Sequence, residues 1–238
     1  MTILQAEEIK RLVSEELPTW IEEQPALRLR LQQLFEGTPG TSRSETTAHK
    51  MTYDEFLEWC DEDTLAEWVD GEVVMTSPAS NRHQDLVRFL TSVLSIYVET
   101  HDLGVIRPAP FQMKLQHGRE PDLLFVAQGH LGRLKETYLD GPADLAVEII
   151  SPESMARDRG DKFYEYAQGG VPEYWLIDPQ VRWVEFYRLA GAHYRPAFSG
   201  DEGVYHSEAL DGFWLRVEWL WQEPLPKTLD VVRELGLL

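Results

Sequence analysis

The stretch "PADLAVEIISPES", residues 142–154, places one acidic side chain, Glu148, inside a short apolar run. Residues 145–150 have the length of a buried strand, and Pro152 ends it. Because successive strand side chains point to opposite faces, Glu148 shares its face with Ile150. An isolated carboxylate among such neighbours costs several kcal/mol or more, so the sequence predicts a cation or a hydrogen-bond donor facing Glu148.

A second acid, Asp122, begins another apolar run in "EPDLLFV", directly after Pro121. Carboxylates at the ends of neighbouring strands can converge on one hard cation. Mg²⁺ suits this arrangement, because one or two carboxylates usually hold it while water and substrate phosphate complete its octahedron. The alternatives are a core glutamate paired with a lysine for Glu148 and a simple strand end for Asp122.

The order of the remaining elements indicates the fold class. Thr52 and Glu55 fit a capping box, Asp70-Gly71 fits a hairpin turn, and residues 81–100 carry one apolar helical stripe. Further elements are expected as strands at 104–107, 109–115 and 121–126, the strand with Glu148, a helix at about 154–168, a strand in "EYWLIDP" and a late hairpin in "VRWVEFYRL" and "AHYRPAF". This order predicts an α/β fold with a mixed sheet flanked by helices.

The chain divides into four expected parts. Residues 1–36 read as an amphipathic helical appendage, 37–50 as a Gly/Ser/Thr-rich linker, 51–222 as the main domain and 223–238 as a C-terminal tail. We expect the appendage to pack on the core or on a second subunit.

Composition narrows the class of protein. With 43% hydrophobic and 26% charged residues, the chain is expected to be an ordinary globular protein. No apolar stretch approaches the ~20 residues of a membrane helix, and the N-terminus lacks a signal-peptide pattern, so we expect a cytoplasmic protein without a membrane partner. The single cysteine excludes an intramolecular disulfide. A net charge of −19 disfavours nonspecific nucleic-acid binding but leaves room for a local basic patch or a metal-bridged phosphate. The acid-rich stretch 53–72 is expected to be mainly solvated.

Three blocks together carry a family resemblance: "EPDLLFV", "ADLAVEIISPES" and "RDRGDKFYEYAQGGVPEYWLIDP". In this order and spacing, and with "VDGEVVMTSPASNRHQ" before them, the chain resembles the Uma2 family of putative restriction endonucleases, in the PD-(D/E)XK nuclease superfamily, over roughly residues 50–222. The resemblance implies a restriction-endonuclease-like core and divalent-metal-dependent cleavage of phosphodiester bonds in nucleic acid, with DNA as the expected substrate and RNA left open. It also implies Mg²⁺ as cofactor with Mn²⁺ as a substitute, and a homodimer would suit cleavage of both strands.

One position departs from the superfamily pattern. The superfamily's Glu-x-Lys places a lysine two residues after the acid, and here that residue is Ile150. The expected replacement is Lys162 on the following helix, with Lys114 in reserve. A competing explanation for Lys162 is a solvated helix pair with Asp158, four residues earlier, worth ~0.3–0.5 kcal/mol.

The resemblance implies roles for the individual residues. Asp122, Glu148 and the backbone carbonyl of Ile149 would hold the metal ion. Lys162 would orient the attacking water or stabilise charge in the transition state. Glu72 would add a carboxylate through water or to a second ion, although it could equally be a solvent-facing strand residue.

His83 lies on the inner stripe of its helix and is expected either to touch the site or to be a packing residue. Two other functions remain open. One is a nuclease fold that serves as an interaction or regulatory module with little catalysis. The other, less favoured, is a glycosidase that uses the two carboxylates.

Overall fold

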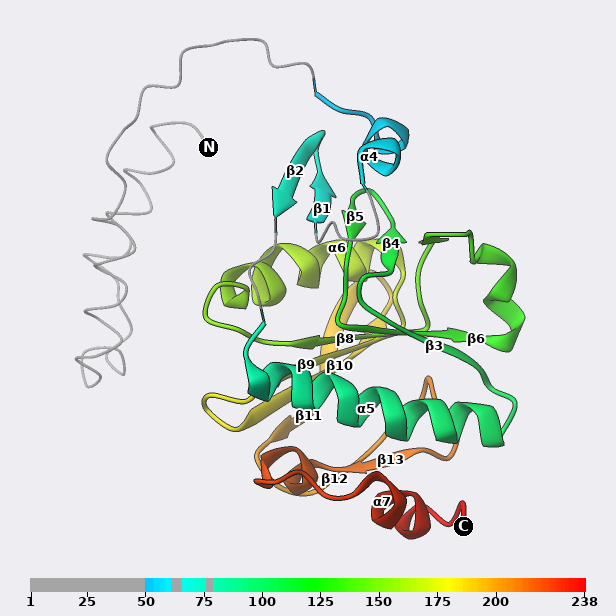
Figure 1. The fold of residues 1–238 in the computed structure, drawn as a ribbon, viewed down its shortest axis with the longest axis vertical. Helices are drawn as coiled ribbons and strands as arrows, with labels where there is room; N and C mark the ends of the chain where they lie inside the picture. Colours follow the sequence, from blue (N-terminus) through cyan, green and yellow to red (C-terminus); the bar gives the residue numbers. More distant parts are fainter. Residues whose placement is uncertain (1–49, 61–65, 76–78) are drawn as a thin grey trace, which may run out of the picture. The chain divides into compact units, whose positions relative to one another are not determined.

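The central sheet is built around the strand that holds Glu148 (Figure 1). The computed structural model describes residues 50–60, 66–75 and 79–238. The appendage expected at 1–36 and all but the last residue of the linker expected at 37–50 lie outside the described residues.

The sheet has six strands in the order β11-β10-β9-β8-β6-β3, and its pairs are antiparallel except for parallel β8 and β9. The strands are β3 Gly104–Pro108, β6 Leu123–Ala127, β8 Leu145–Ile149, β9 Glu173–Asp178, β10 Trp183–Ala190 and β11 His193–Gly200. The expected mixed sheet is therefore confirmed, including the late hairpin of β10 and β11.

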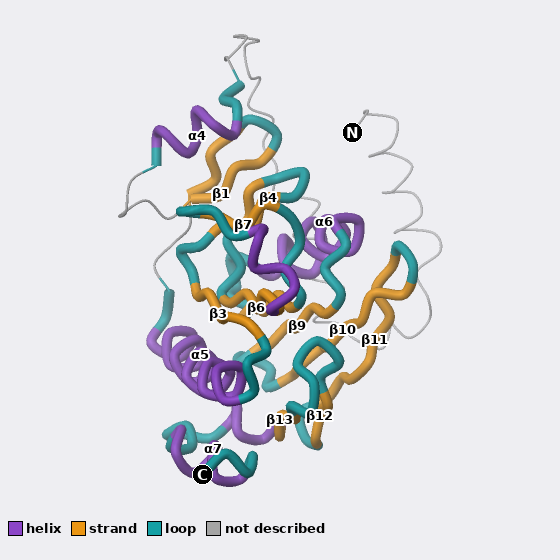
Figure 2. The backbone as a smooth tube through the Cα atoms, turned by 90° about the vertical axis from the view of Figure 1, so that its right-hand side faces the viewer, coloured by secondary structure: helices purple, strands orange, loops and turns teal. Residues whose placement is uncertain are grey.

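The two faces of this sheet carry different cores, as Figure 2 shows for the helices on either side of it. Leu145, Val147 and Ile149 of β8 belong to the core that includes α5, Asn81–Thr100. Ala146 and Ile150 belong to the core that includes α6, Lys162–Gly169. The alternation predicted for this strand is confirmed, and it directs Glu148 toward α6.

The helix α5 begins and ends where the sequence predicts, with the Ser80 hydroxyl capping the His83 amide at 3.2 Å. The helix expected at 154–168 begins differently. A π-helical turn, η2 Arg157–Asp161, precedes α6, and the Lys162 amide donates to the Arg157 carbonyl, five residues earlier. Gly170 ends α6 with φ 85°, in the left-handed region that glycine favours.

A second sheet lies on the α6 side of the first, in the order β2-β1-β5-β4-β7. Its strands are β1 Ala66–Val69, β2 Glu72–Met75, β4 Gln112–Lys114, β5 Gly118–Arg119 and β7 Tyr138–Asp140. The strand expected at 109–115 belongs to this sheet. It is shorter than predicted, because Pro110 lacks the N–H that a ladder needs. The hairpin at Asp70-Gly71 is confirmed, with φ of 50° and 84° at its two turn residues. The capping box of Thr52 and Glu55 is also confirmed, at the start of α4, Tyr53–Trp59.

The C-terminal residues belong to the same compact unit, which runs from His49 to Leu238. They form η3 Val217–Trp221 and α7 Thr228–Glu234, after the two-stranded sheet of β12 Val204–His206 and β13 Trp214–Arg216. Val231 of α7 is buried in the core that includes α5. The sequence pattern did not predict these elements or η1, Gln128–Arg133.

A buried glutamate, Glu173, fastens the chain around residue 208 to the central sheet. Its side chain is 1% exposed and lies at the start of β9. The carboxylate accepts hydrogen bonds from the Trp175 indole, the Tyr205 and Ser207 hydroxyls and the amides of residues 208 and 209, all within 2.7–3.0 Å. These five donors replace hydration, so this buried acid is stabilised without a cation.

Glu173→Ala is expected to lower the free energy of unfolding by about 3–5 kcal/mol, because buried donors lose their acceptor. Urea denaturation followed by tryptophan fluorescence measures the change. The matched control is Glu202→Ala, which removes an exposed glutamate. Equal stability of the two variants would contradict a structural role for the Glu173 cluster.

Candidate active site

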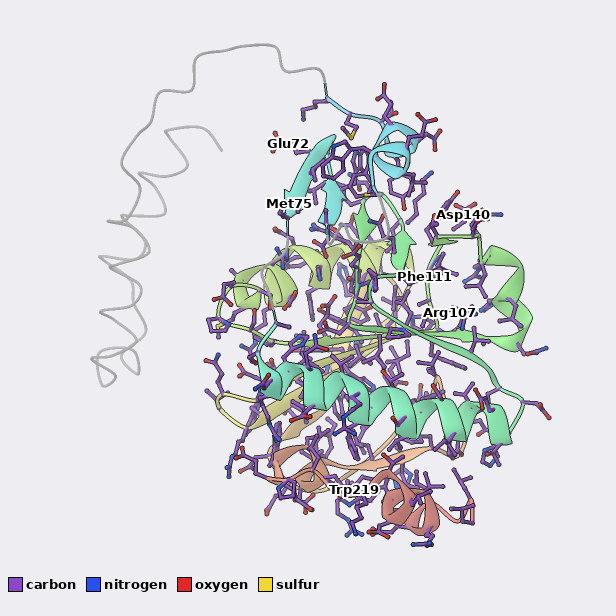
Figure 3. The ribbon with its side chains drawn as sticks, in the orientation of Figure 1. Glu72, Met75, Arg107, Phe111, Asp140 and Trp219 are labelled. Carbon is purple, nitrogen blue, oxygen red and sulfur yellow. The ribbon has the colours of Figure 1, made fainter. Side chains whose placement is uncertain are left out.

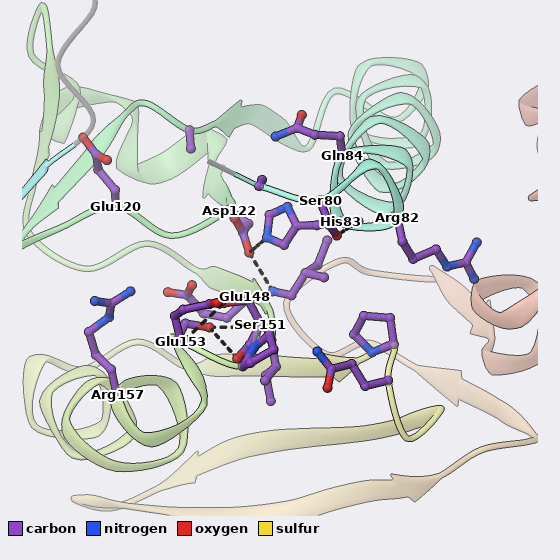
Figure 4. A pocket seen from close by; sticks show the side chains of 18 of the residues that line it. Ser80, Arg82, His83, Gln84, Glu120, Asp122, Glu148, Ser151, Glu153 and Arg157 are labelled. Atoms are coloured by element: carbon purple, nitrogen blue, oxygen red, sulfur yellow. Dashed lines mark hydrogen bonds and ion pairs between the residues drawn. The ribbon is translucent and has the colours of Figure 1, made fainter. Parts of the chain in front are cut away.

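A pocket of about 600 Å³ lies where β1, β6 and β8 meet the start of α5 and the η2–α6 segment. Its polar and charged lining comprises Glu67, Ser80, Arg82, His83, Gln84, Glu120, Asp122, Glu148, Ser151, Glu153, Ser154, Arg157, Lys162 and Gln180. Figure 4 shows these side chains on the strands and on the two helices, with His83 directed toward Asp122. The pocket therefore gathers residues that are far apart in sequence.

The ladder between β6 and β8 brings Asp122 and Glu148 to neighbouring positions. Leu123 pairs with Val147. Because the strands are antiparallel, Asp122, one residue before Leu123, lies opposite Glu148, one residue after Val147. The Ile149 amide also donates to Asp122 Oδ2 at 2.6 Å, which fixes that carboxylate beside the strand end. Two acids 26 positions apart in sequence thus line one pocket.

Glu148 accepts hydrogen bonds from two side chains of α6. Its Oε1 accepts from Lys162 Nζ at 2.8 Å and from the Tyr166 hydroxyl at 2.9 Å, and the whole residue is 4% exposed. The pairing of a core glutamate with a lysine, which was the alternative explanation for Glu148, is therefore present in the structure. Burial above all, and then the charges of Asp158 and Asp122, raise the pKa of Glu148, although Lys162 lowers it.

Lys162 lies at the centre of three carboxylates. Its Nζ is 2.8 Å from Glu148, 3.0 Å from Glu67 and 3.5 Å from Asp158. The expected pair of Asp158 with Lys162 forms, but the expectation that it is solvated is wrong, because these residues are 1% and 2% exposed. Burial lowers the pKa of Lys162, and the three carboxylates raise it by more, so the ammonium stays charged.

Glu67 is a site residue that the sequence interpretation missed. Its Oε1 accepts from the Glu120 amide and pairs with Lys162, and its Oε2 pairs with Arg119 at 3.0 Å. Burial raises its pKa, but Lys162 and Arg119 outweigh burial, and the pKa is lowered overall. The available signal was the one that identified Glu148: an acid between apolar neighbours in a short strand.

His83 touches the site through Asp122. Its Nε2 is 3.2 Å from Asp122 Oδ2, from the first turn of α5. Burial lowers the pKa of His83, while the hydrogen bond and charge of Asp122 raise it to a net increase. Of the two readings of this histidine, the structure shows the one in which it contacts the site.

Two candidates lie elsewhere. Glu72 is exposed on β2, at the hairpin (Figure 3), and does not line the pocket; Glu67 on the partner strand does. Lys114, the reserve lysine, lies over the rings of Tyr53 and Tyr138, 4.5 and 5.7 Å from their centroids. Lys162 is therefore the lysine that the structure brings to Glu148.

The donor set fits a divalent cation held by two carboxylates. Glu148 Oε2 and Asp122 Oδ1 accept no hydrogen bond from the described part of the chain, so each acid keeps one oxygen for a ligand. No three His, Cys, Asp or Glu side chains in residues 50–60, 66–75 and 79–238 are grouped so that they could hold a metal ion. A site with two acids and remaining positions for water and phosphate matches the preference of Mg²⁺.

A model of the Uma2 family, described as putative restriction endonucleases, matches residues 53–218, which include the acids, Lys162 and the six strands of the central sheet. The chain belongs to the Uma2 family. The predicted membership is thereby confirmed.

The fold is also similar to that of a solved protein. The crystal structure of a putative nuclease belonging to DUF820 from Anabaena variabilis ATCC 29413 matches with a TM-score of 0.61 and 18% identity, covering 72% of this chain and 97% of that chain. At this identity the likeness shows the fold, and the expected nuclease-like α/β fold is confirmed. No curated protein matches the chain.

Proposed function

We propose that this Uma2 protein is a divalent-metal-dependent endonuclease that hydrolyses phosphodiester bonds in DNA. The observation that carries the proposal is the placement of Asp122 and Glu148 side by side, each with an oxygen left for a ligand, next to the buried ammonium of Lys162. Family membership and the nuclease-like fold support the same activity.

Each residue has a defined task in this proposal. Asp122, Glu148 and the main-chain carbonyl of Ile149 would hold Mg²⁺, with Mn²⁺ as a substitute. When bound, the cation polarises a phosphoryl oxygen and lowers the pKa of water. Lys162 holds Glu148 in place and supplies positive charge as the phosphate gains negative charge. His83 and the Ile149 amide both contact Asp122 Oδ2, so Oδ1 is the oxygen that would bind the ion.

Partner and location follow from class and composition. A homodimer remains our proposal, because it would provide one site for each strand of a duplex. Across the described residues, no helix has the length and apolarity needed to cross a bilayer. The single cysteine supports the proposal of a reducing, cytoplasmic environment.

Chelation tests the proposal directly. We expect the protein to cleave plasmid DNA with Mg²⁺ or Mn²⁺, to stop in excess EDTA and to resume when the metal is restored. Asp122→Asn keeps an oxygen for the Ile149 amide but removes the charge, so it should lose cleavage and keep the fold. Equal cleavage by wild type and Asp122→Asn, measured on identically purified protein, would defeat the proposal.

A second candidate function is an interaction module with a nuclease fold. It is favoured by one observation: Glu148 already has a lysine and a tyrosine as partners and is neutralised without a metal ion. Calorimetric titration with Mn²⁺ separates the two candidates. Heat of binding that disappears in Asp122→Asn supports the nuclease, and no heat with wild type supports the module.

A further inference from the structure

The pocket is acidic, so a nucleic-acid chain can enter it only if a cation meets its phosphates. Five carboxylate side chains line the pocket, namely Glu67, Glu120, Asp122, Glu148 and Glu153. The whole protein carries a net charge of −19, so long-range attraction of a polyanion is absent. Substrate binding must depend on local groups.

Three long cationic side chains line the pocket, and two are committed to the protein itself. Lys162 is surrounded by three carboxylates and is 2% exposed. Arg82 donates to the main-chain carbonyls of Leu220 and Gln222, and in Figure 4 its side chain extends away from Asp122 and Glu148. Neither can donate a hydrogen bond to a phosphate without breaking these contacts, and Lys162 can act on a phosphate only through its charge.

Arg157 is in a different state. In the described part of the chain its guanidinium donates no hydrogen bond, and its nearest charged partner is Glu67, with Nε 3.8 Å from Oε2. Its side chain is 26% exposed and rises from η2 beside the acids (Figure 4). The contact with Glu67 holds the positive charge near the pocket without using the donors.

We propose that Arg157 binds a backbone phosphate of the nucleic acid in this pocket, and this inference deepens the proposed nuclease function and rests on it. A guanidinium offers its N–H groups as a rigid fork that matches two phosphate oxygens. Arg157 makes that fork available next to the acids, where the phosphodiester chain must lie. It acts as a substrate-binding residue and takes no part in bond breaking.

Binding without cleavage tests this role. A fluorescently labelled oligonucleotide is titrated in EDTA against wild type, Arg157→Gln and Arg195→Gln, with anisotropy as readout. The control changes the net charge equally at an exposed position on β11, outside the pocket lining. We expect Arg157→Gln to weaken binding about tenfold and to reduce the salt slope by about one unit, with little change in Arg195→Gln.

Several outcomes would overturn the proposal. These are unchanged affinity in Arg157→Gln, an equal loss in Arg195→Gln, and no binding by wild type. Competition by inorganic phosphate as effective as competition by unlabelled oligonucleotide would identify a free-phosphate site and would also overturn it. Arg157→Lys keeps the charge and should lose affinity while keeping the salt slope, so the fork is tested even if the glutamine variant fails to fold.

The result is independent of hydrolysis. Arg157-dependent binding by a protein that never cleaves would sustain this inference and defeat the proposed nuclease activity. Cleavage with a normal KM in Arg157→Gln would support the nuclease activity and defeat the proposed phosphate contact of Arg157.

Discussion

Replacing Glu148 with glutamine is expected to reduce DNA cleavage at least about 10³-fold, which corresponds to about 4 kcal/mol of barrier. Glutamine keeps an oxygen that can accept from Lys162 and Tyr166, but it loses the charge that would hold the metal ion. Initial rates of plasmid nicking with Mg²⁺ measure the effect. Glu153→Gln removes an exposed acid from the same pocket and is expected to retain most activity.

The same variant should be more stable than wild type at neutral pH. Burial, first of all, raises the pKa of Glu148 in the folded protein. The contribution of such a carboxyl to stability is fully present below its unfolded pKa, about 4.3. It is lost as pH rises from there through the pKa of the folded state. The stability difference should therefore grow in favour of glutamine as pH increases from about 4. A constant difference across this range would show that ionised Glu148 carries no folding cost.

Lys162→Met is expected to lower the free energy of unfolding by about 3–5 kcal/mol in EDTA, because it removes the cation that three buried carboxylates share. Excess Mg²⁺ or Mn²⁺ should restore part of this stability, and the metal-induced rise in Tm should exceed that of wild type. The physical reason is that a divalent ion and the Lys162 ammonium would neutralise the same carboxylates. Thermal unfolding with and without metal measures both effects.

Two comparisons make the Lys162 experiment specific. Lys114→Met removes a lysine that lies over two aromatic rings and does not line the pocket, so it should show no added metal dependence. Adding Glu148→Gln to Lys162→Met should recover stability in EDTA, since one of the uncompensated charges disappears. A Lys162→Met protein as stable as wild type in EDTA would show that the lysine is not the counter-ion of this cluster.

Much of the central sheet could be predicted, because its strands and the α5 helix carry strong apolar periodicity. Glu148 within β8 and Asp122 directly before β6 were recognisable as anomalies for the same reason. Glu67 carries the same signature, but its four-residue strand lies within the acid-rich stretch 53–72, whose composition predicts solvated charges. The burial of Glu67 depends on Arg119, which is 52 positions away, and no local pattern contains that pairing.

The second sheet was beyond local prediction for a related reason. The strands β4, β5 and β7 have two or three residues each, too few to establish a period of two. They exist because their ladders join segments that only the tertiary fold brings together. The position of Lys162 was predictable in outline, whereas its burial among three acids was not, since helix spacing alone favours a solvated pair.

The π-helical turn η2 contains one residue more than an α-helical turn would hold, directly before Lys162. Loss of a single residue here would restore regular winding and rotate the preceding segment by about 100° about the helix axis. Arg157 would then leave the pocket and Asp158 would lose its contact with Lys162, while Lys162 stayed. We therefore expect a one-codon deletion at this turn to disable the proposed site as strongly as loss of one of its acids, whereas most surface connections tolerate a change in length.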